Sequence, residues 1–173
     1  CTVNQVLEKD YDRLMKRTQS RPLPTERLNN SESLWFAAFT AFVGIALLWV
    51  STNMLTVSLS VLSMILYSVV YTPLKRVGPI AVFVGAFPGA LPPLLGWTAA
   101  TGTISHEALI IFGIQFIWQF PHFWAIAWVA DEDYKKAGFK LLPVKGEKDM
   151  KTAFQIMTYT LFLIPLGLLP TYF

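Results

Sequence analysis

Residues 33–51 read SLWFAAFTAFVGIALLWVS, a stretch with no charged side chain and few polar ones. A membrane-spanning helix needs about 20 mostly apolar residues, because the hydrocarbon core of a bilayer is about 30 Å thick. Four further stretches meet the same requirement, at 54–71, 79–100, 107–130 and 152–173. The sequence therefore predicts an all-α fold, a polytopic transmembrane helix bundle.

The composition of the 173-residue chain supports this fold class. Its mean hydropathy is +0.47 and 14% of its residues are charged, against roughly 25% in a typical soluble domain. The net charge of +3 is too small to indicate nucleic-acid binding, and the basic residues alternate with acidic ones. Cys1 is the only cysteine, which excludes a disulfide framework and a cysteine-based metal cluster. The length fits one membrane domain, residues 1–173.

The two ends of the sequence lead us to expect a fragment of a longer chain. There is no initiator methionine, the sequence stops at Phe173 inside an apolar run, and residues 1–12 resemble the end of an earlier helix. A lipidated N-terminal Cys1 is the alternative. That alternative would place the following basic loop outside the cell, against the preference of basic loops for the cytoplasmic side.

The distribution of basic residues predicts the orientation in the membrane. All 14 Lys and Arg residues lie in three connections: six within 8–30, two within 72–78 and six within 131–151. The other two connections, near 52 and near 103, contain none. Because basic loops face the cytoplasm, the three basic connections are expected on one cytoplasmic face. The acidic residues near positions 8–12 and 131–133 are then expected on that face too.

The first acidic cluster has a helical spacing. Asn4, Glu8 and Asp12 are spaced i, i+4, i+8, which on a helix places them on one face over about 12 Å. Mg2+ prefers oxygen ligands and is usually held by one or two carboxylates together with substrate phosphates. The bases that follow can bind phosphate oxygens; they are Arg13, Lys16, Arg17 and Arg21. The alternative is a solvated basic loop with incidental acids.

A second cluster repeats this composition after the fourth predicted span. Carboxylates at 131–133 are followed by lysines at 135, 136 and 140. Two such clusters on one face fit a Mg2+-bridged diphosphate whose organic tail lies in the membrane. Tyr71 and Lys75 are four residues apart at the same face, where Lys75 can meet a phosphate. The alternatives are a charged loop after a span and, for Lys75, an ordinary basic residue of a cytoplasmic loop.

His122 lies inside the fourth predicted span, where an ionisable side chain is costly and indicates a functional site. The alternative is a neutral histidine that is hydrogen-bonded to a carbonyl freed by Pro121. Nearby aromatic side chains can line a cavity and stabilise a cation through their ring faces, or simply pack; they are Trp118, Phe120, Phe123, Trp124 and Trp128. The third span is expected to break at 87–89 and 92–93, where its prolines lie.

Five segments together resemble a known family. They are NQVLEKDYDRLMKRTQSRPLP (4–24), YTPLKR (71–76), GALPPLLGW (89–97), WQFPHFWAIAW (118–128) and DYKKAGFKLLPV (133–144). The family is that of the protoheme IX farnesyltransferases, a branch of the UbiA-type superfamily of intramembrane prenyltransferases, and the similarity runs in order through essentially the whole chain. It implies a helical fold around a central cavity, with more spans than the five found in this sequence.

The resemblance also implies a reaction. Diphosphate leaves farnesyl diphosphate with the help of Mg2+, a vinyl group of protoheme IX attacks the allylic cation, and water captures the new cation to give haem O. The implied partners are the lipid bilayer and a downstream haem A synthase. The implied location is the bacterial inner membrane with the active-site face cytoplasmic, or the mitochondrial inner membrane. The competing functions are an aromatic or quinone-precursor prenyltransferase of the same superfamily, a small-molecule transporter and a structural membrane subunit.

Position by position, Asn4, Glu8 and Asp12 match the family motif N-x-x-x-D-x-x-x-D, with Glu8 one methylene longer than the usual Asp. The second motif departs from D-x-x-x-D because Lys135 replaces its last acid, so Asp133 is preferred over Asp131. The residues and the resemblance together assign these roles: catalytic, Asp12, Tyr71, Lys75 and Asp133; diphosphate binding, Arg13, Arg17, Arg21, Lys75 and Lys135; Mg2+ binding, Asn4, Glu8, Asp12, Asp131 and Asp133; haem binding, His122.

Overall fold

The computed structural model describes residues 2–143 and 147–172, and the regular structure in these residues is entirely helical. Five helical segments are long and apolar enough to cross a membrane, which confirms the predicted fold class. They are α3 (Asn30–Ser51), α4 (Met54–Ile65) continued by η1 (Leu66–Tyr71) and α5 (Thr72–Leu74), α6 (Ile80–Thr101), α7 (His106–Val129), and α9 (Met150–Leu168) continued by η2 (Leu169–Tyr172). Three short helices are α1 (Thr2–Leu7), α2 (Lys9–Asp12) and α8 (Asp131–Lys136).

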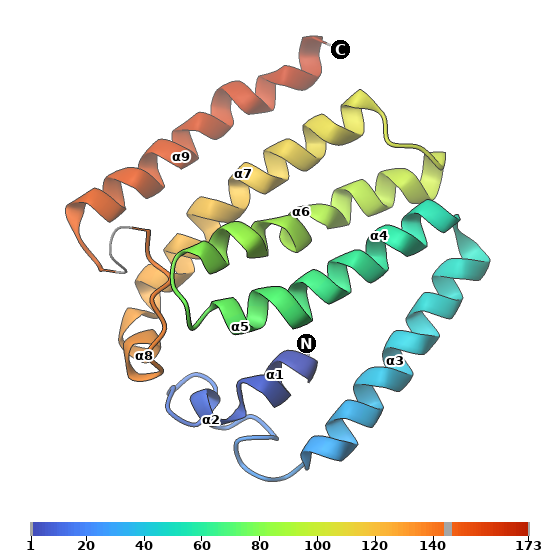
Figure 1. The fold of residues 1–173 in the computed structure, drawn as a ribbon. Coiled ribbons are helices and arrows are strands. Elements are labelled where there is room, and N and C mark those ends of the chain that lie inside the picture. The colour runs from blue at the N-terminus through green and yellow to red at the C-terminus, as the bar shows by residue number, and fades with distance from the viewer. Residues whose placement is uncertain (1, 144–146, 173) are drawn as a thin grey trace.

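The five spans lie side by side in chain order (Figure 1), and each packs against the next. The closest packing is between α6 and α7. The outermost helices, α3 and α9, expose most of their apolar side chains. The short helices α1, α2 and α8 gather at one end of the row (Figure 1). The core therefore lies along α6 and α7, against η1 on one side and α9 on the other, and the charged segments meet at one end of it.

Side-chain caps fix where the long helices begin. Asn29 accepts from the Glu32 amide while Glu32 accepts from the Asn29 amide, which forms a capping box for α3. Asn53, Ser105 and Asp149 each accept a hydrogen bond from the third residue of α4, α7 and α9, respectively. Each cap satisfies a backbone N–H that has no partner inside its helix.

The predicted break of the third span is wrong, because α6 continues as one helix through Pro88, Pro92 and Pro93. Pro93 has no N–H to donate to the carbonyl of Gly89, four residues earlier. The Gln119 side chain on α7 supplies the missing donor, with its Nε2 2.8 Å from that carbonyl oxygen. A Cβ on Gly89 would lie 2.7 Å from Cδ of Gln119, so only glycine allows this approach. The neighbouring helix thus satisfies the backbone that a proline frees.

The second span contains a π-helical segment that the sequence analysis did not predict. Residues Leu66–Tyr71 form η1, between α4 and α5. Thr72 donates through Oγ1 to the Tyr67 carbonyl at 2.9 Å, across the end of this segment. The segment brings the Tyr71 ring against Gly85 of α6, where a Cβ would lie 2.6 Å from Cε2 of the ring. Insertions of this kind are frequent at functional sites.

Candidate active site

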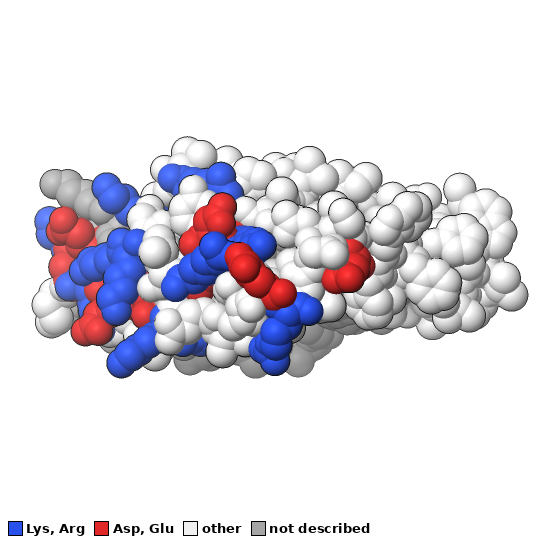
Figure 2. Space-filling view, turned by 90° about the horizontal axis from the view of Figure 1, so that it is seen from below, with Lys and Arg blue, Asp and Glu red and all other residues white. Residues whose placement is uncertain are grey.

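Charged side chains gather at the end of the molecule where α1, α2 and α8 lie. Figure 2 shows Lys, Arg, Asp and Glu crowded over this end, while other parts of the same view are white. The spans themselves carry few charged residues, as the sequence indicates. This end therefore presents mixed positive and negative charge above an apolar helical layer.

The first cluster is buried at this end. Asn4, Glu8 and Asp12 are 9%, 4% and 1% exposed. Although α1 ends before Glu8 and α2 begins after it, the backbone keeps its i to i+4 hydrogen bonds. The Glu8 amide donates to the Asn4 carbonyl at 2.9 Å, and the Asp12 amide donates to the Glu8 carbonyl at 2.8 Å. The three side chains therefore keep the common inner stripe that the spacing predicts, whereas Asp10 is exposed.

Two cations pair with this stripe. Lys75, just after α5, lies with its Nζ 3.0 Å from Oε1 of Glu8 and donates to Oε2 at 3.2 Å. The same ammonium lies 4.9 Å from the centre of the Tyr71 ring. Arg21 donates from Nη1 to Oδ2 of Asp12 at 2.9 Å. The fold thus brings Tyr71 and Lys75 to the first cluster, which is more than 60 residues away in sequence.

Burial dominates the electrostatics of Glu8. Removal from water raises the pKa of this carboxyl above its usual value, and the neighbouring Lys75 opposes the rise. Asn4 Oδ1 and Glu8 Oε1 are buried and accept no hydrogen bond from the described residues, although Lys75 lies within ion-pair distance of Glu8. A buried polar atom without a hydrogen bond costs about 1–3 kcal/mol. Two neighbouring oxygens with unused capacity fit the ligand chemistry of Mg2+.

The second cluster approaches the first through the turn that follows α2. The backbone amide of Arg17 donates to Oδ2 of Asp133 at 3.2 Å. Tyr134, next to Asp133, is half-buried, and burial raises the pKa of its hydroxyl while Arg17 lowers it. The Phe139 ring, just after α8, lies 5.4 Å from the Tyr11 ring of α2. Residues 116 positions apart in sequence are therefore in contact at one end of the molecule.

Arg76 connects α1 to the end of the second span through contacts that the sequence did not predict. Arg76 donates from Nη2 to the Leu7 carbonyl at 2.9 Å, and its guanidinium lies 4.4 Å from the centre of the Tyr11 ring. Thr18 donates through Oγ1 to the Asp12 carbonyl at 3.0 Å and is 1% exposed. Neither residue has a spacing signal in the sequence, because each acts through a backbone carbonyl that only the fold brings near.

Some predicted residues are engaged elsewhere. Arg13 pairs with Glu26 at 2.6 Å and donates to the Pro24 carbonyl at 3.2 Å, within its own turn. Asp131 pairs with Lys135 at 2.8 Å, one helical turn along α8. Among residues 2–143 and 147–172, no three His, Cys, Asp or Glu side chains are close enough to hold a metal together. The five predicted ligands therefore do not form a single protein cage, and a metal held here would need oxygens from a substrate.

An apolar cavity of ≈ 370 Å³ lies between the second span, α6 and α7. Its lining includes Tyr67, Ser68, Gly85 and Phe123, and the Tyr71 ring lies against two of these rings, 5.3 Å from Tyr67 and 6.0 Å from Phe123. The Lys75 ammonium, which pairs with Glu8, lies 4.9 Å from the centre of the same Tyr71 ring. Tyr71 therefore contacts both a cation of the charged cluster and two residues of the cavity wall.

The predicted aromatic group divides between two roles. Phe120 and Trp124 are buried in the core between α6, α7 and α9, so these two rings pack in the core, as in the second of the two predicted alternatives. His122 instead stacks on Trp118, with ring centres 4.3 Å apart and planes 17° apart. It makes no hydrogen bond to a described residue, so the predicted alternative of a bond to a freed carbonyl is not observed.

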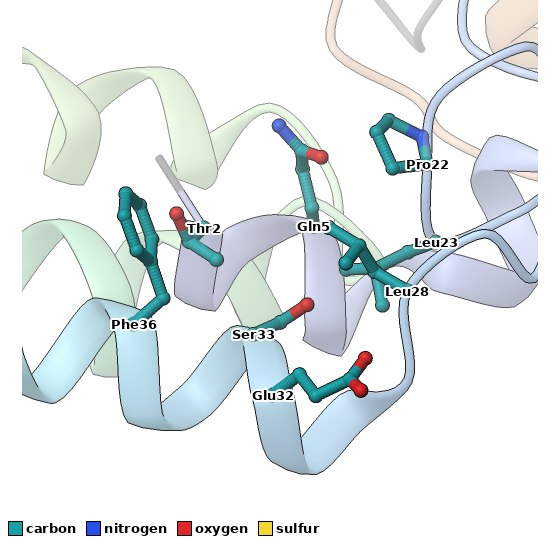
Figure 3. Close-up of a pocket in the computed structure, with 8 residues that line it drawn as sticks. All are labelled: Thr2, Gln5, Pro22, Leu23, Leu28, Glu32, Ser33 and Phe36. Atoms are coloured by element: carbon teal, nitrogen blue, oxygen red, sulfur yellow. The ribbon is translucent and has the colours of Figure 1, made fainter.

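Another cavity, of ≈ 280 Å³, lies between α1, the turn and the start of α3 (Figure 3). Its walls are mainly apolar, and the polar groups at its edge include Gln5 and Glu32. No residue of the two acidic clusters lines it. The Glu32 carboxylate already accepts the capping hydrogen bond of α3. We therefore assign this cavity no part in the site.

Comparisons with known proteins give a consistent result. All 173 residues match the sequence model described as the UbiA prenyltransferase family. The chain is 53% identical over 171 residues to the protoheme IX farnesyltransferase of Cytophaga hutchinsonii, covering 99% of this chain and 60% of that protein. It is 48% identical over 169 residues to the Flavobacterium psychrophilum protein of the same name, covering 98% and 56%. The chain spans little more than half the length of these relatives. No solved structure matches it.

Proposed function

Because the chain belongs to the UbiA prenyltransferase family and is an integral membrane protein with five apolar spans, we propose that the complete protein farnesylates haem. The reaction is the Mg2+-dependent transfer of a farnesyl group from farnesyl diphosphate to a vinyl group of protoheme IX. The observation that carries the proposal is the convergence of two charged segments over an apolar, aromatic-lined cavity. The names of the relatives support the choice of acceptor.

The buried stripe and its two cations would bind the diphosphate. Asn4, Glu8 and Asp12 offer oxygens to Mg2+, which when bound would offset the negative charge of the leaving diphosphate. Lys75 and Arg21 already lie at that stripe and can turn from their carboxylate partners to phosphate oxygens. Asp133 would complete the site from the opposite side, next to the Arg17 amide. The other predicted residues would contact the diphosphate only from the edge of the site, because Arg13 pairs with Glu26 and Asp131 pairs with Lys135.

Loss of diphosphate breaks the allylic C–O bond, and the leaving group gains negative charge. Cations fixed beforehand stabilise that charge more in the transition state than in the substrate. Lys75 suits this role because it is 14% exposed and its position is set by both Glu8 and Tyr71. A water-poor pocket strengthens these interactions and delays capture of the cation by water.

Aromatic faces would stabilise the allylic cation as it forms. Tyr71 is 6% exposed, and its ring lies near the Lys75 ammonium and near two rings of the cavity wall, those of Tyr67 and Phe123. The face of an aromatic ring attracts a cation through its quadrupole, an effect of about 0.5–2 kcal/mol that grows when water is excluded. The farnesyl chain would extend into the apolar cavity of ≈ 370 Å³ below.

Orientation and partners follow from charge and from the relatives. The basic end is expected on the cytoplasmic side, and the relatives named above are bacterial, which favours the inner membrane of a bacterium over a mitochondrial membrane. The farnesylated product would be passed to a haem A synthase, which remains a predicted partner. The crowding of the acids at one end also argues against a transporter, whose sites lie near the midplane.

The test is product formation by the complete protein in membranes. Farnesyl diphosphate and haem are added with and without Mg2+, and farnesylated haem is measured by mass spectrometry. We expect product only with Mg2+, and a loss on the order of 100-fold for Asp12→Asn. Asp10→Asn is the matched control, because Asp10 lies on the same short helix but is exposed. Farnesylation of 4-hydroxybenzoate but not haem, or equal effects of the two substitutions, would contradict the proposal.

A further inference from the structure

The apolar cavity of ≈ 370 Å³ has a defined length along the second span and α6. These two helical segments run side by side in opposite directions (Figure 1). Toward the charged end, the Tyr71 ring lies against Gly85. Toward the other end, the Thr56 hydroxyl lies 2.9 Å from the Thr98 hydroxyl. All residues of the two segments that line the cavity lie within the limits that these two contacts set.

The contact away from the charged end is a polar clasp formed by Asn53, Thr56 and Thr98. The Thr56 hydroxyl donates to Oγ1 of Thr98 at 2.9 Å, and the Thr98 hydroxyl donates to the Leu95 carbonyl at 3.2 Å. Asn53 donates from Nδ2 to the Thr98 carbonyl at 2.6 Å. Both threonines are buried. Hydrogen bonds of this kind hold neighbouring spans together, so the polar clasp keeps α4 close to α6 immediately beyond the cavity.

Leu95 and Ser60 line the cavity next to the polar clasp. Leu95 is three residues before Thr98 and Ser60 is four residues after Thr56, so each lies about one helical turn inside the polar clasp. Ser60 is small, and its hydroxyl donates to the Thr56 carbonyl of its own helix at 2.8 Å. Leu95 is the larger side chain at this level, and it packs against a buried apolar cluster that consists of Leu91, Leu94 and Ala108. Leu95 therefore forms a supported end wall of the cavity.

The length of the cavity matches a particular prenyl chain. Leu95 lies ten residues after Gly85 on α6, which corresponds to about 15 Å of helix. With carbon–carbon bonds of about 1.5 Å, an extended farnesyl chain is roughly 14 Å long, and a further isoprene unit adds roughly 5 Å. A chain that starts beside Tyr71 therefore reaches the end wall with three isoprene units. A fourth unit would have to displace Leu95 or leave the cavity.

We propose that Leu95 is the specificity-determining residue for the length of the prenyl donor, because its side chain ends the cavity at the level of Ser60. The inference rests on the part of the proposed function that places a prenyl chain in this cavity, and it does not depend on the identity of the acceptor. A chain of four isoprene units is excluded by the end wall. A chain of two units fits but leaves apolar space unfilled, so it gains less from burial.

The experiment measures the affinity of the complete protein in detergent, with Mg2+ and without an acceptor, for non-reactive thiodiphosphates that carry geranyl, farnesyl or geranylgeranyl chains. The wild-type protein should bind the farnesyl compound most tightly. Leu95→Ala should raise the affinity for geranylgeranyl relative to farnesyl on the order of 10-fold, since even one methylene in an apolar pocket changes discrimination by about 10–200-fold. Ser60→Leu should act in the opposite direction and raise the affinity for geranyl relative to farnesyl by a similar factor.

The matched control is Leu94→Ala, the same substitution at the neighbouring residue. Leu94 is buried in the cluster that supports Leu95, and it does not line the cavity. We expect its affinity ratios to equal those of the wild-type protein, whatever its stability. Ser60→Leu adds volume where Leu95→Ala removes it, so it tests the same end wall independently of the fate of the Leu95→Ala protein.

The inference is overturned if the wild-type protein binds the farnesyl and geranylgeranyl compounds equally, because the chain then does not end at Leu95. It is also overturned if Leu95→Ala and Ser60→Leu leave the affinity ratios unchanged, or if Leu94→Ala changes them as much as Leu95→Ala does. Failure of the proposed function is a different result, because transfer to haem is measured in a separate assay. A protein that shows the expected chain-length ratios but does not prenylate haem would contradict the proposed acceptor and leave the role of Leu95 in place.

Discussion

At the scale of single residues, the site depends on a glycine that touches no substrate. Tyr71 can lie against α6 only because Gly85 has no side chain there, since a Cβ would come within 2.6 Å of the ring. The same ring contacts Lys75, which pairs with Glu8. A chain of contacts thus connects the packing of two spans with the position of a cation at the charged end.

We predict that Gly85→Ala displaces Tyr71 and destabilises the protein by about 1–3 kcal/mol, the usual cost of overpacking a well-packed core. Farnesyl transfer should fall with it. The measurement is thermal unfolding in detergent together with the rate of product formation. Gly96→Ala on the same helix is the control, because its Cβ meets open space; we expect it to be neutral or to stabilise by about 0.5–1 kcal/mol. A Gly85→Ala protein as stable and active as the Gly96→Ala protein would refute this account.

The Glu8–Lys75 pair gives a second residue-scale prediction. The two side chains are 5% and 14% exposed, so removing the cation leaves a buried carboxylate without its partner. Lys75→Met should destabilise the protein by about 3–5 kcal/mol. Adding Glu8→Gln should recover part of that loss, because the second change removes the unpaired charge. Denaturant unfolding of the two single variants and the double variant measures the effect, and a double variant less stable than Lys75→Met would contradict it.

At the scale of elements, α6 shows how a helix with three internal prolines stays continuous. The carbonyl freed by Pro93 is taken up by Gln119 of α7, so a donor on one span completes the backbone of another. The sequence displays the prolines, which is why a break was predicted. It does not display the compensating amide, because Gln119 and Gly89 meet only when α6 and α7 pack.

This arrangement predicts a specific double-mutant result. Gln119→Leu should destabilise the protein by about 1–3 kcal/mol, the cost of a buried carbonyl without a donor. In a Pro93→Ala background, the new backbone N–H can donate to the Gly89 carbonyl, so the same substitution should cost clearly less. Unfolding of the four proteins gives the coupling free energy. An equal effect of Gln119→Leu in both backgrounds would show that Gln119 does not serve that carbonyl.

The start of α9 predicts a dependence on pH. The Asp149 carboxylate accepts a hydrogen bond from the Thr152 amide at 2.7 Å, and this bond lowers the pKa of Asp149 below its usual 3.8. A lowered pKa in the folded state means that the cap stabilises the helix above the unfolded value and that this stabilisation is lost as pH falls through the folded value. Acid should therefore loosen the first turn of α9.

Amide hydrogen exchange at Thr152 and Ala153 measures this loosening, with Asp149→Asn as the comparison. Asparagine also caps helices but does not titrate. Below pH 3.8 we expect exchange in the wild-type protein to become faster than in Asp149→Asn, and near neutral pH we expect the two to be similar. A constant ratio across this range would contradict a role for the ionised cap.

At the scale of the whole molecule, the features that the sequence predicted are those that depend on the composition or spacing of one segment. The five apolar stretches predict the spans, and the confinement of Lys and Arg to three connections predicts that distant acids share one end; the Arg17 amide indeed contacts Asp133. Asn4, Glu8 and Asp12 share a stripe because helical spacing is a local property. The sequence could not supply the choice of partner for other side chains: Arg13 pairs with Glu26, and Arg76 donates to a carbonyl of α1. These depend on side-chain distances that exist only in the packed molecule.

The central claim is that the segments around Asp12 and Asp133 act on one metal-bound diphosphate. The most direct measurement is a double-mutant cycle on the Mg2+-dependent affinity of the complete protein for a non-reactive farnesyl thiodiphosphate, using Asp12→Asn, Asp133→Asn and the double variant. Sites that share a ligand couple by about 0.5–3 kcal/mol, so we predict that the double variant loses clearly less affinity than the sum of the single losses. Strictly additive losses, or an Asp133→Asn protein that binds like wild type, would show that the two segments do not hold a common ligand.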